Sequence, residues 1–581
     1  MRARRHLVLL LVPVLAWIAA LLQRAQPLNW DEIEFFRATR WVSEGLIPYR
    51  DFWEHHTPLQ WFVFAPVARL FGGGAGVGAV LAMRWAQVPL WIGAFVLLFS
   101  LMRRGGADVT SRWLAILLLL TSRSFVIWAV QYRVDALGNV LLLCGLILLA
   151  SRRWIAFGVV MSAAALANMR LVPLIVLTAL IALFWSSGEE RWRWNPRALT
   201  MAIGVVAVAG IAIAYLVLTG AWAGFIEGIV GYNSFFNRVA AAQAPNMLRP
   251  VLLAPFRMSD VSGIALWMLA IGETFLAMRD VRRPSLPQIV ALLFIAAIVS
   301  LAVASPVQYD YHLQTAWLLM VPLAGLAFTR LLASQPRFGW LAFATIAVAL
   351  ALNLLDFVHP TFGKGLDYQD LVMKEVDRRT APGATVWDGT GYALRRQPAY
   401  RYWFLPVGVR MMAQQGVIAP YDPRGNPPAA IVYDQRVQRW LEAFPNVRRY
   451  TAHHYLPLYR NLLLPGMSTT VDARPLRSVW RVPVTATYHL WAGELGTQPD
   501  LARLLGTGDA YVELDRLPPF PYETLQVMVD GVAIPRGTRV LPLKKGSRIE
   551  LVSSVPRPAG ILFVLHGIRT LGLAPDTPFA F

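Results

Sequence analysis

Long apolar runs, separated by short loops that carry arginine, constrain this chain more than any other sequence feature. Residues 7–22 and 81–102 are two such runs, and each can cross a bilayer as a helix. Only 15% of the 581 residues are charged while 56% are hydrophobic, which leaves too few charges for the surface of a soluble protein. The sequence therefore predicts a polytopic α-helical protein of the cell (inner) membrane, with the lipid bilayer as its first partner.

The arginines between the runs predict how the spans are oriented. Arg2, Arg4 and Arg5 precede the first run, and an arginine pair at residues 103–104 follows the second, so both groups are expected in the cytoplasm. The shorter run at residues 61–71 predicts a helix on the outer membrane surface. About eleven spans are expected, within a few residues of positions 7–22, 81–102, 113–128, 136–150, 154–167, 171–185, 199–218, 261–278, 289–304, 313–332 and 338–355.

The predicted spans divide the chain into three parts. Residues 1–355 form a transmembrane domain, and its large first external loop covers residues 29–80. Residues 356–470 alternate short strands and helices, which predicts an extracytoplasmic α/β region. Residues 471–581 predict an extracytoplasmic β-sandwich-like domain, with a hairpin around Asp530-Gly531. In these last two parts, helices are expected at residues 368–379 and 435–444, and strands at 384–387, 430–433, 548–553 and 561–565.

The basic residues bear on the class of partner. The formal net charge is +20, and almost all of the positive charge is arginine because the chain has only four lysines. Cytoplasmic loops of membrane proteins account for much of such a charge. The other interpretation is an anionic substrate that carries phosphate, since the guanidinium group binds phosphate through two hydrogen bonds. The arginines are scattered and form no basic stripe, so nucleic acid is not expected as a partner.

Residues 29–36 (NWDEIEFF) directly follow the first span and are rich in acids. Asn29 predicts the start of a helix, with Glu32 as its partner in a capping box. Asp31 and Glu32 then lie in the first turn, where the helix dipole stabilises carboxylates. These acids either cap a helix at the membrane interface or carry chemistry there.

The segment at residues 45–59 (GLIPYRDFWEHHTPL) combines charged, imidazole and aromatic side chains in one external loop. Aromatic rings together with carboxylates are typical of sugar-binding surfaces, although an interfacial aromatic belt would also contain them. The adjacent histidines raise the possibility of a metal, but neighbouring residues on a helix point apart. The metal question stays open. The positions concerned are Tyr49, Arg50, Asp51, Glu54, His55 and His56.

The segment from Asp31-Glu32 to residues 45–59 resembles the first external loop of a family, the polyprenyl-phosphate-dependent membrane glycosyltransferases with the C-type fold. This family includes protein O-mannosyltransferases and lipid A aminoarabinose transferases. Residues 131–135 (QYRVD) are similar to the family's Arg-x-Asp element, and residues 308–313 (QYDYHL) to its aromatic and histidine element before a late span. In layout the resemblance covers residues 7–355. Many relatives have a lysine where this chain has Arg170.

The resemblance implies an inverting transfer of a sugar from polyprenyl phosphate to an envelope lipid, glycan or protein on the external face. A lipid phosphate is a competent leaving group, so one carboxylate suffices as the general base on the acceptor. We expect Asp31 to be this base. Glu32 is engaged in the cap, and Glu34 lies about 300° around the helix from Asp31.

The remaining site positions also follow from the resemblance. Arg133, Arg170 and His312 are expected to bind the donor phosphate. No cofactor is identified, and a divalent cation is left open. The substrate-binding positions are Glu32, Tyr49, Arg50, Asp51, Glu54, His55, His56, Asp135, Tyr309 and Tyr311.

A transporter or flippase for a lipid-linked or anionic substrate is the alternative from another class. It would also place arginines and aromatic residues at the ends of its spans. Such a protein is expected to show paired broken helices in two repeated halves, and the sequence has no repeat of fixed period. Turnover of a lipid-linked sugar distinguishes the two hypotheses, because only the transferase consumes it.

Overall fold

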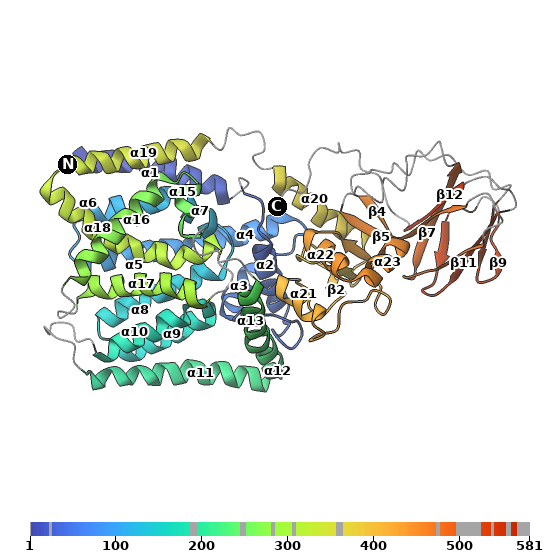
Figure 1. Ribbon diagram of the computed structural model, residues 1–581, viewed down its shortest axis with the longest axis horizontal. Coiled ribbons are helices and arrows are strands. Elements are labelled where there is room, and N and C mark those ends of the chain that lie inside the picture. The colour runs from blue at the N-terminus through green and yellow to red at the C-terminus, as the bar shows by residue number, and fades with distance from the viewer. Residues whose placement is uncertain are drawn as a thin grey trace. The chain divides into compact units, whose positions relative to one another are not determined.

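The computed structural model describes most of the chain (Figure 1). It covers residues 2–22, 26–184, 194–243, 251–279, 285–304, 309–355, 364–459, 461–471, 477–494, 525–535, 538, 540–553 and 559–565. The chain divides into two compact units, Met1–Asp367 and Tyr368–Phe581. The first unit is helical and contains the candidate site, while the second contains the sheets.

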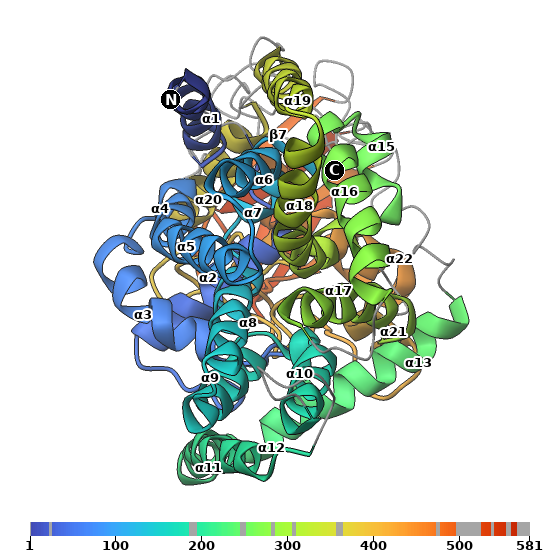
Figure 2. The same cartoon turned by 90° about the vertical axis from the view of Figure 1, so that its left-hand side faces the viewer.

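The long helices of the first unit run alongside one another as a bundle (Figure 1). Viewed along the bundle, α18 lies inside and contacts α5, α6, α16 and α17 (Figure 2). Large apolar side chains of α11, such as Val206, Ile211 and Leu218, are exposed, as lipid-facing residues are in a membrane protein. The bundle comprises α1 (Arg2–Ala20), α5 (Val88–Arg104), α6 (Val109–Thr121), α8 (Val134–Ala150), α9 (Trp154–Ala167), α10 (Val172–Phe184), α11 (Met201–Leu218), α16 (Val261–Met278), α17 (Leu286–Ala304), α18 (Gln314–Ser334) and α19 (Arg337–Leu355).

Shorter helices complete the first unit. Several of them, α2, α3, α12 and α13, gather at one end of the bundle (Figure 1). The short helices are α2 (Trp30–Ser43), α3 (Leu59–Phe71), α4 (Val77–Ala86), α7 (Arg123–Ala129), α12 (Trp222–Phe225), α13 (Asn233–Gln243) and α15 (Ala254–Arg257). Tighter or wider helical turns occur at η2 (Met169–Leu171), η3 (Pro196–Thr200), η5 (Asp310–Leu313) and the π-helix η4 (Ile226–Tyr232).

The predicted apolar spans fall on helices, with breaks of one residue at Gln87 and Ser122, except where a predicted end lies outside the described residues, as Trp185 does. Within the described part, five helices are long and apolar enough to cross a membrane, and a bent pair makes a sixth. The other predicted spans lie on shorter apolar helices. The helix predicted at residues 61–71 is present as α3, and its position on the membrane surface remains a prediction. The number of spans remains a prediction.

The predicted span at residues 113–128 is not one straight helix. It bends by 71° between α6 and α7. At the bend Ser122 has an extended backbone, with φ of −74° and ψ of 110°. The Asp260 carboxylate accepts hydrogen bonds from Ser122 Oγ at 2.6 Å and from the backbone N–H of Ser124 at 2.9 Å. A side chain that caps a new helical turn in this way redirects the chain, and α7 then leads into the loop that holds Arg133.

The second unit contains two sheets among its described residues. The larger has the strand order β10-β7-β12-β5-β3-β1-β2, with β4 also paired to β5, and the smaller has the order β6-β11-β8-β9. Their strands are β1 (Thr385–Trp387), β2 (Gln397–Pro398), β3 (Ala430–Val432), β4 (Tyr455–Tyr459), β5 (Leu462–Val471), β6 (Arg477–Arg481), β7 (Ala486–Glu494), β8 (Leu525–Val529), β9 (Val532–Ala533), β10 (Val540–Leu543), β11 (Arg548–Ser553) and β12 (Ala559–Leu565). The helices are α20 (Lys364–Arg379), which enters this unit, α21 (Val407–Gln414), α22 (Gln435–Ala443) and α23 (Pro445–His454).

The individual elements expected in this unit are confirmed. The parallel pairing of β3 with β1, followed by α22, is the expected strand and helix alternation. The hairpin of β8 and β9 turns at Asp530 and Gly531, whose φ angles of 51° and 85° suit the tight turn. β5 pairs with both β3 and β12, so one sheet joins strands of the predicted α/β and β-sandwich-like regions. Residues 495–524 and 566–581 of the last region lie outside the described residues.

Candidate active site

The helix that follows α1, α2, begins with the predicted capping box. The Asn29 side chain accepts a hydrogen bond from the backbone N–H of Asp31 at 3.0 Å. The backbone N–H of Asn29 donates to the Glu32 carboxylate, also at 3.0 Å. This reciprocal pair fixes where α2 starts, and it therefore fixes the positions of Asp31, Glu32 and Glu34 on successive faces of the helix.

The Glu32 carboxylate is completely buried and serves the fold. Its Oε1 accepts from Arg84 Nε at 2.8 Å and from the backbone N–H of Tyr132 at 2.9 Å. Its Oε2 accepts from Arg84 Nη2 at 2.7 Å and from the Asn29 backbone. With four donors on two oxygens, Glu32 has little capacity left for a ligand. We therefore assign the residue to holding α2, α4 and the Tyr132 loop together, and not to the predicted substrate contact.

Asp31 begins a chain of charged contacts that leads to a cavity. Arg133 Nη1 donates to Asp31 Oδ2 at 3.0 Å, and Arg133 Nε donates to Asp135 Oδ2 at 3.1 Å. Asn168 Nδ2 donates to the other oxygen of Asp135 at 3.0 Å. The Arg133 guanidinium carbon lies 3.7 Å from the centre of the Tyr311 ring. Arg133, expected at the donor phosphate, thus has its charge matched by two carboxylates.

A cavity of about 230 Å³ opens where this chain of contacts ends. Arg170 lines the cavity, and its guanidinium carbon lies 5.4 Å from the Tyr311 ring centre. No carboxylate of the described residues lies within ion-pair distance of Arg170, in contrast to Arg133. Its positive charge is therefore available to an anion in the cavity. The polar lining residues are Asp135, Asn168, Arg170, Asn233, Asn237, Ser300, Tyr309, His312 and Thr315.

His312 offers a second donor to the same cavity. Its Nδ1 accepts the backbone N–H of Tyr309 at 3.4 Å in a capping box at the start of η5. In a neutral imidazole the other nitrogen, Nε2, then carries the proton. Nε2 is buried and has no hydrogen-bond partner within the described part of the chain. Tyr309, which stacks on Tyr311 at 5.3 Å between ring centres, lines the cavity as well.

A smaller cavity of about 100 Å³ adjoins the larger one. His55, His56 and Thr57 line it, and it shares Asn168, Met169, Arg170, Asn233 and Phe236 with the larger cavity. Burial lowers the pKa of His55 to about 4, so this ring is neutral at pH 7. Burial would raise the pKa of Glu54, but hydrogen bonds from His55 and His56 outweigh burial and lower it. The predicted histidine pair thus lies beside Arg170.

The other predicted residues of the first loop lie outside both cavities. The Tyr49 hydroxyl donates to the backbone oxygen of His56 at 2.6 Å, which fixes the loop. Arg50 and Asp51 form an exposed ion pair with 2.8 Å between Nε and Oδ1. Gly224 and Gly228 stand next to the backbone oxygens of Tyr49 and Glu54, where a Cβ atom would collide. The segment containing α12 and η4 can therefore pack directly on the loop backbone.

Several contributors to the site were not predicted from the sequence. Arg84 is a lone charge inside an apolar run, and such a residue usually has a buried partner, so a signal existed. Asn168 stands beside Arg170 in a short polar break between two spans. Asn233 donates to the backbone oxygen of His55 at 3.2 Å and lines both cavities, yet no sequence pattern marks it. Glu34, which was set aside in favour of Asp31, faces His55 and His56.

The bundle of apolar helices, with a polar site where several helices end, defines a multi-pass membrane protein. Its fold is similar to that of ArnT, which agrees with the C-type fold that the sequence resemblance predicts. The crystal structure of ArnT from Cupriavidus metallidurans in the apo state is similar, with a TM-score of 0.53 and 15% identity over 80% of this chain and 98% of ArnT.

The same ArnT bound to undecaprenyl phosphate is also similar. Its TM-score is 0.50 at 14% identity, over 94% of this chain and 97% of that chain. At these identities the likeness establishes the fold alone. No family model matches the sequence, and no curated protein matches it.

Proposed function

We propose that the protein is a membrane glycosyltransferase that moves a sugar from a polyprenyl-phosphate donor to an envelope lipid, glycan or protein on the external face. The observation that carries the proposal is the cavity lined by Arg170, His312 and Asp135, together with the ion pairs through which Arg133 joins Asp135 to Asp31. A phosphate-binding arginine close to a partly exposed carboxylate is the minimum set for transfer from a lipid phosphate.

The donor phosphate is assigned to Arg170 and His312. Arg170 has no carboxylate partner among the described residues, and His312 presents Nε2 as an unused donor. Both groups would stabilise the negative charge that grows on the phosphate as its bond to the sugar breaks. The similar ArnT structure that binds undecaprenyl phosphate supports a lipid phosphate as the ligand.

The polyprenyl chain is assigned to an apolar groove in the first unit. The groove has a volume of about 730 Å³ and is lined almost wholly by apolar residues of α1, α4, α5, α6 and α7. It includes Ala129 and Val130, which precede Arg133 by only a few residues. An isoprenoid chain in this groove would thus have one part close to the loop that holds Arg133.

The general base is assigned to Asp31. The Asp31 side chain is 15% exposed, whereas those of Glu32 and Glu34 are 0% and 1% exposed. The acceptor hydroxyl would lose its proton to the Asp31 carboxylate while its oxygen attacks the anomeric carbon. The bond from that carbon to the phosphate oxygen breaks, the polyprenyl phosphate leaves, and the configuration inverts. Arg133 would orient Asp31 in this step.

Consumption of a lipid-linked sugar tests the proposal. The purified protein in detergent micelles is incubated with a panel of polyprenyl-phosphate pentoses and hexoses together with an envelope extract as acceptor. We expect at least one donor to be consumed, with formation of free polyprenyl phosphate and a glycosylated product. A transporter would move the donor across a proteoliposome membrane and leave its sugar–phosphate bond intact, and that result would refute the proposal.

A further inference from the structure

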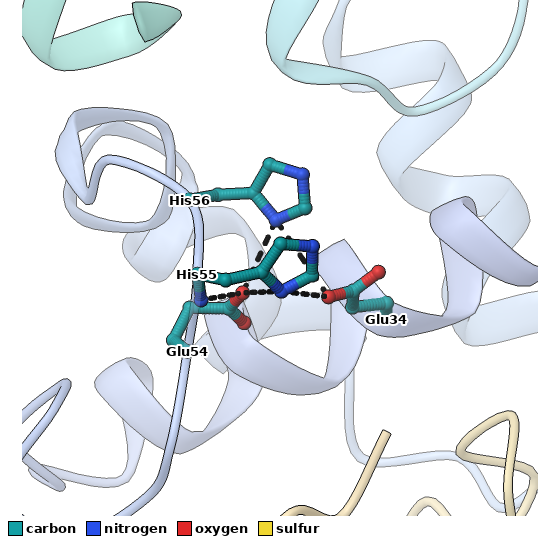
Figure 3. A group of neighbouring side chains, drawn as sticks. All are labelled: Glu34, Glu54, His55 and His56. Atoms are coloured by element: carbon teal, nitrogen blue, oxygen red, sulfur yellow. Dashed lines mark hydrogen bonds and ion pairs between the residues drawn. The ribbon is translucent and has the colours of Figure 1, made fainter. Parts of the chain in front are cut away.

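Four side chains, two of which line the smaller cavity, converge on one another (Figure 3). Glu34 comes from α2, and Glu54, His55 and His56 come from the loop that follows it. One potential ligand atom of each residue lies within 4.8 Å of the other three. Residues 53–57 do not form a helix, so the expectation that the adjacent histidines point apart is wrong. Both Nδ1 atoms face the carboxylates, and the second nitrogen of each ring points away from them (Figure 3).

Three of the four nitrogen–oxygen distances in this group are longer than an ordinary hydrogen bond. His55 Nδ1 lies 3.4 Å from an oxygen of Glu34 and 3.4 Å from one of Glu54. His56 Nδ1 lies 3.6 Å and 3.1 Å from the same two oxygens. Direct N–H···O bonds are usually near 2.9 Å. A tetrahedron with metal–ligand bonds of about 2.0–2.1 Å has edges of about 3.3–3.4 Å. The four nitrogen–oxygen distances lie close to this value, and all the potential ligand atoms lie within 4.8 Å of one another.

The burial of the group adds an independent observation. Glu34 and Glu54 are each only 1% exposed. Glu54 Oε1, the oxygen that faces both histidines, accepts the backbone N–H of His55 at 2.8 Å, and Oε2 of the same carboxylate is buried and has no hydrogen-bond partner among the described residues. A buried carboxylate oxygen without a donor costs free energy unless a cation compensates it.

We propose that Glu34, Glu54, His55 and His56 bind one divalent transition-metal ion, and that the ion is zinc. Two imidazole nitrogens with two carboxylate oxygens in tetrahedral spacing are ligands that zinc accepts, whereas magnesium and calcium prefer oxygen ligands alone. The Tyr49 hydroxyl bond to the His56 backbone holds the ligand loop in place, as outer contacts do in metal sites.

The ion would lie beside the position assigned to the donor phosphate. His55 and His56 line the smaller cavity together with Arg170, so the bound cation would add positive charge to the wall that Arg170 also forms. The metal site does not depend on the transferase proposal, because its occupancy can be measured without any sugar donor.

Metal analysis of the full-length protein tests the inference. The protein is purified without a histidine tag, exchanged into metal-free buffer, and its metals are measured by mass spectrometry. We expect about one zinc ion per chain, as a structural or catalytic zinc site gives. The double substitution Glu54→Gln with His56→Asn should lose it. His453→Ala changes an exposed member of the other histidine pair and should retain it. A double variant that keeps its zinc would overturn the proposal.

A second measurement uses the unaltered protein, because a buried variant can fail to fold. The protein is stripped with EDTA and titrated with zinc and, separately, with cobalt(II). Zinc should raise the melting temperature, since a ligand that binds only the folded state stabilises it. Cobalt should give the strong visible absorption of a four-coordinate ion. No zinc at purification together with no rise in melting temperature on adding zinc would show that the four residues only hydrogen-bond one another.

Discussion

Helix α2 carries two buried glutamates, two positions apart, whose surroundings differ. Glu32 is matched by Arg84, and its oxygens accept hydrogen bonds from a guanidinium and two backbone N–H groups. Glu34 instead faces a second carboxylate, Glu54, and the imidazoles of His55 and His56. A buried carboxylate balanced by arginine stabilises one arrangement of the chain. Two buried carboxylates placed together with imidazoles are suited to a ligand. One helix thus holds the fold on one face and presents chemistry on another.

Removing Glu32 should have the largest effect on stability. Glu32→Ala leaves the Arg84 guanidinium buried without its carboxylate, and breaking such a pair costs about 3–5 kcal/mol in the free energy of unfolding. Denaturant unfolding in detergent measures the change. Glu44→Ala is the matched control on the same helix, because its ion pair with Arg40 is exposed. We expect less than about 1 kcal/mol there. Equal losses in the two variants would remove the structural role given to Glu32.

Substitution of Arg170 tests whether the larger cavity binds the donor phosphate. Arg170→Ala should weaken undecaprenyl phosphate binding by about 1.5–3 kcal/mol, the usual strength of a charge-assisted phosphate contact. The dissociation constant in detergent measures the effect. Arg170→Lys should restore part of it, because the charge returns without the planar fork. The exposed Arg69 of α3 is the control, and Arg69→Ala should bind normally. An unchanged affinity in Arg170→Ala would place the phosphate elsewhere.

His312 should contribute less than Arg170 to the same affinity. His312→Phe removes the Nε2 donor while keeping a planar ring, and the loss of one hydrogen bond typically costs about 1 kcal/mol. The same binding measurement applies, with His453→Ala as the control histidine. If His312→Phe binds undecaprenyl phosphate as tightly as the native protein, the unused Nε2 donor has another purpose.

Substitution of Glu34 should have the smallest effect on the free energy of unfolding, in contrast to substitution of Glu32. In EDTA-treated protein, Glu34→Gln should change the free energy of unfolding by less than about 1 kcal/mol, because an isosteric neutral group replaces one of two neighbouring buried charges. Glu32→Gln, measured beside it, should cost several times more. A loss for Glu34→Gln as large as that for Glu32→Gln would mean that both glutamates serve the fold in the same way.

The features that depend on local sequence were predictable. Apolar runs located the helices, because burial in lipid or in a bundle needs continuous apolar residues. Asn29 and Glu32 located the start of α2, because a capping box involves residues only three apart. Asp530-Gly531 located the hairpin in the second unit through its turn geometry.

The features that depend on distant residues were not predictable. The bend at Ser122 needs Asp260, which lies 138 positions further along the chain. The burial of Glu32 needs Arg84, 52 positions away. The shared direction of His55 and His56 needs an irregular backbone, which periodicity does not reveal. The resemblance to a family named most of the site residues, but only contacts across the fold separated Arg133, held by two carboxylates, from Arg170.

The rate at which the Asp31→Asn variant consumes the donor is the most direct test of Asp31 as the general base. The substitution keeps the shape of the side chain and removes its basicity, while asparagine can still accept the hydrogen bond from Arg133. At saturating donor, we expect a rate about 10²–10⁴-fold below that of the native protein, the usual loss on removing a general base. Undecaprenyl phosphate affinity should stay unchanged. A rate within about twofold of native would show that the transfer does not need Asp31 as its base.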